Sequence, residues 1–356
     1  MKRLWLWFFY ITATCGLCLI DPALFVHFAT AAEREQIRVV GSSAVYPFAA
    51  TIAERFSFQD GSRTPIIESI GTGGGFKVFC SGIGPEHPDI VTASRKITAN
   101  EVAQCVNRSV KSVYEIVLGF DGVVFALSNK IENFSVTREQ LFFALAEMVP
   151  IGGKLIKNPY IYWSDIDQKL PRIRIRILGP TPSSGTRDAI VDLVMKPACK
   201  EVCKITSLKI NCQQIRQDGA YVDVGVNENM IIQKVDLIPG AVGIVSYSFL
   251  DQNLDRIHPL MIEGTAPTQE TIQDQSYILS RPLYIYAKPD HENFMSELHE
   301  FLIEFTLPSV SGSSGYLGRR GLIPLNPQQH DEQHQRVVNK SQVLDLTNFA
   351  ESSEND

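Results

Sequence analysis

The chain has 356 residues, of which 44% are hydrophobic and 20% are charged, so it can bury a sizeable core and is not a disordered, collagen-like or coiled-coil chain. Asp and Glu number 39 against 33 for Lys and Arg, a formal net charge of −6, which argues against a protein that coats nucleic acid because no broad basic field exists. The length predicts two domain-sized units, and any anion that binds must be held by local geometry.

The first 31 residues are predicted to be a secretion signal. Lys2 and Arg3 precede an apolar run over residues 4–20, and the segment ends in Ala29-Thr-Ala31, the small-x-small pattern of a signal-peptidase site. A membrane anchor is the alternative, since the run is close to spanning length. Export would place the mature chain in a compartment where disulfides persist.

Strands alternate with helical patterns in the first third of the chain, which favours mostly parallel sheets with helices outside. Strands are predicted at residues 37–40, 65–70 and 89–92, and the third ends at Ser94 and Arg95. The first two strands lead through a turn into a helix.

Helix positions follow from apolar spacing and from capping residues. Capping boxes begin a helix at Thr98 with Glu101 and another at Thr137 with Gln140. The two earlier helices carry apolar residues at helical spacing, Phe48, Ile52 and Phe56 in one and Phe76, Phe79 and Cys80 in the other.

Two apolar stretches, residues 113–127 and 280–287, are predicted to be strands that cross between the two units. Residues 173–177 alternate Ile with Arg, which predicts a strand with one apolar and one basic face. After Pro327 the chain is rich in Gln, His, Asp, Glu, Asn and Ser, so residues 328–356 are predicted to be a disordered polar tail.

Cysteine positions predict two disulfides, Cys80 with Cys105 and Cys199 with Cys212. Two of the 7 cysteines lie in the predicted signal, and the remaining five are an odd number, so one thiol is spare. A zinc site in the cluster of Cys199, Cys203 and Cys212 is the alternative, but the spacing lacks the paired CxxC form and no histidine lies nearby in the sequence.

Three turns rich in glycine and hydroxyl groups, at residues 41–44, 71–75 and 183–186, each follow a strand and begin a helix. Free backbone N–H groups and the positive end of the helix dipole meet at such a turn, so an oxyanion fits there. One such turn alone is an ordinary helix cap, but three in both halves of an exported chain favour a shared anion site in a cleft outside the carboxyl ends of the strands.

Several motifs, in order over residues 37–325, resemble the periplasmic phosphate-binding proteins of ABC-type phosphate uptake systems. The motifs are Gly41-Ser-Ser-Ala-Val-Tyr-Pro47, Gly71-Thr-Gly-Gly-Gly-Phe-Lys77, Ala93-Ser-Arg95, Gly119-Phe-Asp-Gly122, Ser184-Gly-Thr-Arg-Asp188, Ile215-Arg-Gln-Asp-Gly219, Ala241-Val-Gly-Ile-Val-Ser-Tyr247 and Ser280-Arg-Pro-Leu283.

The resemblance implies an α/β, two-lobed periplasmic binding protein of type II, in which each lobe is a mostly parallel sheet flanked by helices and two crossover strands form a hinge. On this reading lobe 1 comprises residues 32–116 and 281–327, and lobe 2 comprises residues 117–280. Phosphate is then bound by hinge closure and delivered to ABC transporter permease subunits.

The resemblance also implies a set of phosphate-binding residues. The first loop supplies side-chain donors from Ser42 and Ser43, because Ala44 or Val45 stands where relatives often have Thr. The full set expected to contact phosphate is Ser42, Ser43, Ala44, Thr72, Ser94, Arg95, Asp121, Ser184, Gly185, Thr186 and Arg187.

Two departures from the family pattern concern charge. Some relatives carry Asp where this chain has Arg95, and Arg where it has Pro180. That Asp accepts the proton of monohydrogen phosphate and rejects sulfate, and Asp121 is the candidate to replace it. Arg95 is expected to pair bidentately with the anion, since a planar guanidinium suits two oxygens; a surface charge is the alternative reading.

The predicted function is therefore high-affinity phosphate uptake in the periplasm by a monomeric binding protein that is not an enzyme and uses no cofactor or metal. The alternatives are a receptor for another oxyanion such as sulfate, and an exported phosphate-ester hydrolase with Ser184 as nucleophile. A hydrolase needs a base within hydrogen-bond reach of the serine, and no histidine has a signature neighbourhood.

Overall fold

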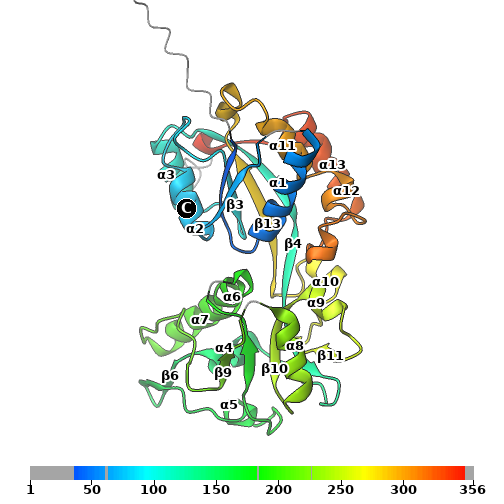
Figure 1. Cartoon of the computed structure of the whole chain (residues 1–356). Helices are drawn as coiled ribbons and strands as arrows, with labels where there is room; N and C mark the ends of the chain where they lie inside the picture. The colour runs from blue at the N-terminus through cyan, green and yellow to red at the C-terminus, as the bar shows by residue number, and fades with distance from the viewer. Residues whose placement is uncertain (1–35, 61–62, 183, 226, 349–356) are drawn as a thin grey trace, which may run out of the picture. The chain divides into compact units, whose positions relative to one another are not determined.

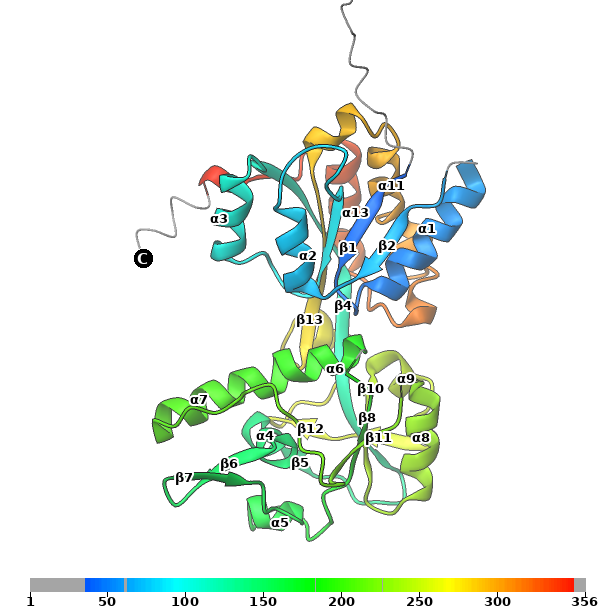
Figure 2. The ribbon, with the colours of Figure 1, turned by 60° about the vertical axis from the view of Figure 1, so that its left-hand side comes forward.

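The computed structural model describes residues 36–60, 63–182, 184–225 and 227–348, so the predicted signal at residues 1–31 lies outside the described residues. Among the residues that are described, no helix has both the length and the apolar character needed to cross a membrane. The fold is α/β with two lobes, shown as ribbons in Figures 1 and 2.

The two lobes share the long strand β4 (Ser112–Ser128) of a ten-stranded sheet. The sheet order is β2-β1-β3-β13-β4-β10-β8-β9, and β11 and β14 also pair with β4. Strands are thus confirmed at both predicted crossing stretches, and Figure 1 shows β4 and β13 passing between the lobes. The other strands are β1 Arg38–Gly41, β2 Ile66–Ser69, β3 Ile90–Ala93, β8 Ile177–Gly179, β9 Tyr221–Asp223, β10 Val242–Ser246, β11 Ile257–Pro259, β13 Ser280–Ala287 and β14 Val343–Asp345.

In the first lobe, β1 pairs in parallel with β2 and β3, while β13 is antiparallel to β3 and β4. Helices cover both faces of this sheet, because residues of α1 and α11 belong to one buried cluster and those of α2 and α3 to another. Both predicted apolar helix faces are buried, and the predicted Thr98 capping box is present. The helices are α1 Tyr46–Asp60, α2 Thr72–Phe79, α3 Ala99–Asn107, α11 Leu298–Glu304, α12 Pro308–Ser311 and α13 Pro327–Val338.

In the second lobe, β10 is antiparallel to β4 and parallel to β8, which is parallel to β9. The Thr137 capping box is present at the start of α4. The helices are α4 Arg138–Leu145, α5 Trp163–Ile166, α6 Gly185–Ile190, α7 Lys196–Thr206, α8 Glu228–Leu237, α9 Tyr247–Asp251 and α10 Gln269–Gln273, with a π-helical stretch at Val191–Met195. Short strand pairs add β5 Ser135–Val136 with β12 Met261–Ile262, and β6 Met148–Ile151 with β7 Lys154–Lys157.

The predicted strand over residues 173–177 is wrong in its bounds, because β8 begins only at Ile177. The preceding residues bond instead to a neighbouring loop: the Trp163 N–H donates to the Ile173 carbonyl, and the Ile175 N–H donates to the Ile161 carbonyl. The alternation of Ile and Arg correctly predicted that Ile175 and Ile177 are buried. It could not predict whether a neighbouring strand pairs with these residues.

Both predicted disulfides are confirmed. Cys80 is bonded to Cys105, and Cys199 to Cys212, which leaves Cys203 as the free thiol of the described chain. Three sulfurs lie together in the second cluster, but two of them are bonded to each other, so this arrangement does not offer three thiolates to a zinc ion.

The prediction of a disordered tail is wrong for residues 328–345. This segment contains α13 and β14, and β14 pairs with residues 112–114 of β4. The inward side of α13 is largely polar: His330 contacts the Ser311 hydroxyl at 3.1 Å, and Gln333 accepts from the backbone N–H of Val117 at 3.3 Å. A hydrophobicity pattern does not detect a helix whose buried side is mostly polar.

Candidate functional site

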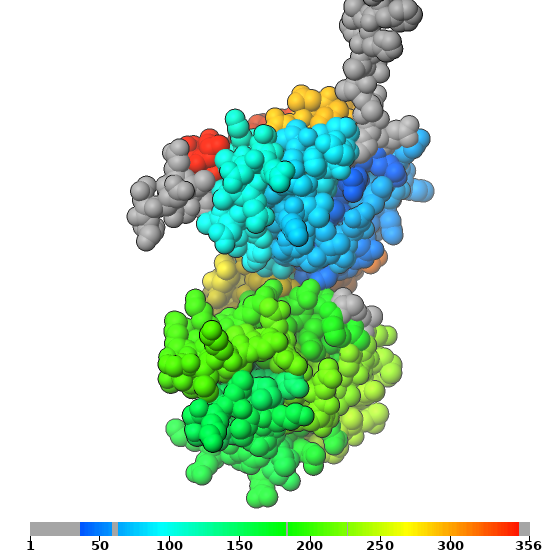
Figure 3. All heavy atoms as spheres, turned by 90° about the vertical axis from the view of Figure 1, so that its left-hand side faces the viewer, coloured from blue at the N-terminus to red at the C-terminus, as the bar shows by residue number. Residues whose placement is uncertain are grey.

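The predicted loops line two neighbouring cavities. The first, here called the hinge cavity, has a volume of about 300 Å³ and is lined by Ser43, Ala44, Pro47, Phe48, Asp121, Ser184, Gly185, Thr186, Glu228, Ser246, Phe249, Arg320 and Gly321. The second, here called the loop cavity, has a volume of about 430 Å³ and is lined by Ser42, Gly71, Thr72, Gly73, Ser94, Arg95, Pro182, Arg187, Asp188, Val191, Asp192, Lys196 and Gln213. Figure 3 views the face where the blue and cyan residues of the first lobe lie next to the green residues of the second.

The eleven predicted site residues are divided between these cavities. The hinge cavity contains Ser43, Ala44, Asp121, Ser184, Gly185 and Thr186, and the loop cavity contains Ser42, Thr72, Ser94, Arg95 and Arg187. The two cavities adjoin, because consecutive residues line different ones: Ser42 lines the loop cavity and Ser43 the hinge cavity, and Arg187 lines the loop cavity and Thr186 the hinge cavity. The predicted residues therefore lie along one continuous region, but not around a single hollow.

The two lobes touch at the junction of the cavities. The Ser43 hydroxyl donates a hydrogen bond to Oδ2 of Asp188, which joins the loop after β1 to α6. Gly185 lies directly against the same loop: a Cβ at this position would come within 2.6 Å of the Ala44 Cα and N atoms. Because such a distance is far below van der Waals contact, glycine is what allows the two loops to approach this closely.

A buried arginine that was not among the predicted ligands lies behind the hinge cavity. Arg281 on β13 is 4% exposed and donates to Asp121 on β4, with Nε and Nη2 at 3.3 and 3.2 Å from Oδ2. Its Nη2 also donates to the carbonyl of Gly185 at 3.1 Å. The remaining nitrogen, Nη1, is buried and has no hydrogen-bond partner among the described residues. Arg281 thus connects the crossing strands to the third loop and retains a free donor.

A second charged residue that was not predicted, Glu228 at the start of α8, is 9% exposed and lines the hinge cavity. Its Oε2 accepts from the Ser246 N–H and hydroxyl, both at 2.9 Å, and its Oε1 accepts from the Thr186 hydroxyl at 3.2 Å. Burial raises the pKa of Glu228 and the charge of Asp121 adds to the rise, while the hydrogen bonds from Ser246 and Thr186 work against it.

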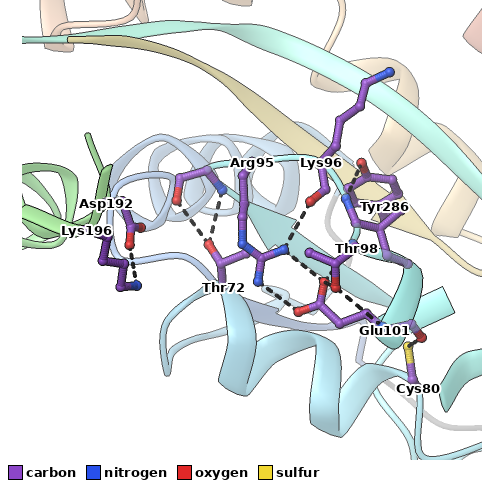
Figure 4. Close-up of polar contacts among 11 residues, drawn as sticks. Thr72, Cys80, Arg95, Lys96, Thr98, Glu101, Asp192, Lys196 and Tyr286 are labelled. Atoms are coloured by element: carbon purple, nitrogen blue, oxygen red, sulfur yellow. Dashed lines mark hydrogen bonds and ion pairs between the residues drawn. The ribbon is translucent and has the colours of Figure 1, made fainter. Parts of the chain in front are cut away.

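Arg95, which was expected to hold the anion, forms an ion pair with Glu101 in its own lobe. Its two terminal nitrogens each donate to one oxygen of Glu101 at 2.8 Å, as Figure 4 shows. The hydrogen bond to Glu101 raises the pKa of Arg95. Burial by itself would raise the pKa of the Glu101 carboxyl, but the hydrogen bonds from Arg95 and Thr98 outweigh it, so that pKa is lowered. The side chain of Arg95 is 40% exposed, so the guanidinium can be reached from the loop cavity, but an anion must compete with Glu101.

Other loop-cavity residues are also paired within their own lobe. Thr72 and Ser94 lie with their hydroxyl oxygens 3.1 Å apart, and the Ser94 N–H donates to the Thr72 hydroxyl at 3.1 Å. Arg187 stacks over the ring of Tyr221 at 4.6 Å, and the Tyr221 hydroxyl donates to the Pro180 carbonyl at 2.7 Å. The backbone of Pro180 thus helps to hold the ring on which Arg187 rests.

The chemistry that this arrangement offers is anion binding. Hydroxyl groups and buried guanidinium nitrogens lie close to carboxylates in this region. Among the described residues, no histidine lines either cavity, so neither lining includes an imidazole base. A signal for Arg281 was present in the sequence, since it is a charged residue in an otherwise apolar crossing strand. Glu228 gave no comparable signal, because an acidic residue in the first turn of a helix is common at exposed sites.

A family model described as the PBP superfamily domain matches residues 27–308 of this chain. Among similar curated proteins, the phosphate-binding protein PstS of Staphylococcus saprophyticus is 26% identical, over 85% of this chain and 84% of its own length. Protein SphX of Synechococcus elongatus is 24% identical, over 76% of this chain and 73% of its own length.

Solved structures give the same architecture. A possible phosphate-binding protein from Planctomyces limnophilus superposes with a TM-score of 0.68 at 23% identity and covers 85% of this chain and 98% of its own. An ABC-type phosphate transport receptor from Vibrio cholerae has a TM-score of 0.58 at 19% identity, with coverage of 82% and 100%. These similarities confirm the predicted two-lobed binding-protein fold.

Proposed function

This chain belongs to the PBP superfamily domain family, and from that membership we propose that it is an exported receptor that binds inorganic phosphate and delivers it to an ABC permease. The proteins it resembles include phosphate-binding proteins and a phosphate transport receptor, as their names state. The chain would act as a monomer in the periplasm after removal of its signal, without catalysing a reaction.

The observation that carries this proposal is the meeting of loops from both lobes at the junction of the two cavities. Ser43 comes from the loop after β1, and Thr186 lies in the first turn of α6, the helix that follows β8. An anion placed between them would gain contacts in the closed state that the open state lacks, so its binding would shift the population toward closure. Closure would also form the surface that the permease recognises.

We assign the positive charge at this site to two arginines. Arg281 offers a buried free donor behind Asp121 and Gly185, and Arg95 lies across the loop cavity. Hydrogen bonds to a charged group contribute roughly 1.5 to 3 kcal/mol each, so several convergent donors offset the desolvation of a small dianion even in an acidic protein. Ser42, Thr72, Ser94, Ser184, Gly185 and Arg187 complete the proposed contacts.

Isothermal titration calorimetry of the mature chain with phosphate tests the proposal. Saturable binding of one phosphate per chain is expected, with sulfate a much weaker competitor at the same pH. Heat with sulfate and none with phosphate would instead identify a receptor for another oxyanion. Turnover of a chromogenic phosphate ester that is lost in Ser184→Ala would contradict a purely binding role.

A further inference from the structure

The hairpin of β6 and β7 in the second lobe carries exposed apolar side chains next to lysines. Among the described residues, the two strands pair with each other and with no other strand, so the hairpin is an isolated two-stranded ribbon. Ile151 and Ile156 are each 37% exposed, and Lys154 and Lys157 are exposed as well. Single exposed apolar side chains are common on proteins, but several on one short segment indicate a surface that meets a partner.

The chain directly after β7 extends this surface. Ile161 is 49% exposed, and its carbonyl accepts a hydrogen bond from the Ile175 N–H at 2.8 Å. The backbones of Tyr162 and Arg174 are paired, and the guanidinium of Arg172 lies over the Tyr162 ring at 5.1 Å. The basic side of the alternating Ile and Arg segment therefore adjoins the exposed isoleucines.

Residues 151–162 and 172–174, here called the hairpin surface, lie in a basic part of an acidic chain. Residues 148–176 contain six Lys and Arg against two Asp and Glu, whereas the whole chain has 33 against 39. Among the described residues, none of these six cations has a carboxylate oxygen within 4.0 Å. Elsewhere in the second lobe, Lys130 and Lys196 each form an ion pair. The hairpin surface is therefore positively charged and suited to an anionic partner.

A bilayer with anionic headgroups has the chemistry that matches this surface. Its headgroups attract lysine and arginine, and its interface accepts isoleucine and tyrosine side chains. A stable protein interface needs about 800 Å² on each partner, whereas a bilayer binds a small protruding ribbon. Figures 1 and 2 show β6, β7 and α5 on the side of the second lobe away from the first lobe. No residue of the hairpin surface lines either cavity, so a bilayer there leaves both cavities uncovered.

We propose that the hairpin surface binds an anionic lipid bilayer, with Lys154 and Lys157 at the headgroups and Ile151 and Ile156 in the interface. This inference goes beyond the proposed function and does not depend on phosphate binding. Salt screens the attraction between the cations and the headgroups, so binding should be reversible and should weaken as the salt concentration rises.

Co-sedimentation of the mature chain with lipid vesicles tests the inference. We expect the chain to sediment with vesicles of equal parts phosphatidylglycerol and phosphatidylcholine at low salt, and to bind about fivefold more weakly in about 0.5 M sodium chloride. It should stay in solution with phosphatidylcholine alone. The double variant Lys154→Gln, Lys157→Gln should bind the anionic vesicles about tenfold more weakly than the unmodified chain.

The double variant Lys77→Gln, Lys111→Gln is the matched control. Both lysines are exposed on the first lobe, and among the described residues neither forms an ion pair, so the same change of charge is made on another surface. This control should bind the anionic vesicles as tightly as the unmodified chain does.

Equal vesicle binding by the two double variants would overturn the inference, as would equal sedimentation with both kinds of vesicle or no sedimentation with either. Binding to beads coated with polyglutamate but not to vesicles would identify an acidic protein as the partner, and would also overturn it. If the first double variant does not fold, Ile151→Ser with Ile161→Ser tests the apolar contact, and unchanged vesicle binding by that variant would overturn the inference. Phosphate calorimetry on the same unmodified sample tests the proposed function separately.

Discussion

The hinge cavity and the loop cavity differ in how their charged groups are paired. At the hinge cavity, Arg281 from β13 binds Asp121 from β4 and the Gly185 carbonyl from α6, so three distant segments meet. At the loop cavity, Arg95 binds Glu101 six residues later, and Lys196 binds Asp192 four residues earlier in the chain. The Arg281 pairing depends on the tertiary fold, while the Arg95–Glu101 and Lys196–Asp192 ion pairs form within short segments.

This difference has a consequence for ligand binding. Arg281 and Asp121 are directly paired residues of the neighbouring strands β13 and β4, whereas the Arg281 bond to Gly185 and the Ser43 bond to Asp188 join other segments to α6. An anion at the junction should therefore gain most of its affinity from the hinge-cavity side. Substitutions at the two cavities should have effects of different size.

Arg281→Lys should have the largest effect. Lysine keeps a positive charge but loses the planar group that binds Asp121 and Gly185 together, so phosphate affinity should fall about 10- to 100-fold in calorimetry. The matched control is Arg216→Lys, since Arg216 is also buried, at 5% exposure, and pairs with Asp218 but lines neither cavity. This control should lower the unfolding temperature and leave phosphate affinity unchanged; equal affinities for both variants would contradict the assignment of Arg281.

Gly185→Ala should have an intermediate effect. The added methyl group would overlap the Ala44 backbone and hold the two loops apart, so we expect phosphate affinity to fall about tenfold. Gly74→Ala in α2 is the control, because its methyl group would meet only Ile70 at 3.7 Å. Small-angle X-ray scattering with saturating phosphate should show less compaction for Gly185→Ala than for Gly74→Ala. Identical compaction would mean that this contact does not limit closure.

Arg95→Gln should have the smallest effect at the site. Its guanidinium must be released from Glu101 before it binds an anion, so we expect affinity to fall only about three- to tenfold. The control is Arg256→Gln, which breaks a comparably exposed pair with Asp236 in the second lobe. A loss at Arg95 greater than that of Arg281→Lys would reverse the ranking of the two cavities.

Local sequence signals predicted the parts of this molecule that are held together locally. The turns with Ser43, Thr72 and Thr186 were found because glycine and hydroxyl residues follow a strand, and the capping boxes at Thr98 and Thr137 are present as predicted. The two disulfides were found from pairs of cysteines close in sequence.

Features that depend on long-range partners were missed for a common physical reason. The Arg281 pairing depends on β13 lying beside β4, and Glu228 depends on Ser246, which is 18 residues away. The helix α13 was misjudged because Gln333 is polar by composition yet binds the Val117 N–H. In each case the deciding partner is set by the fold and not by neighbouring residues.

Crystallography with arsenate, a tetrahedral analogue of phosphate located by its anomalous scattering, tests the central claim most directly. The account predicts one arsenic peak at the junction of the cavities, within hydrogen-bond distance of residues from both lobes, with Ser43 and Thr186 among its contacts. A peak bound by a single lobe, for example between Arg95 and Thr72 alone, or no peak at saturating arsenate, would contradict it.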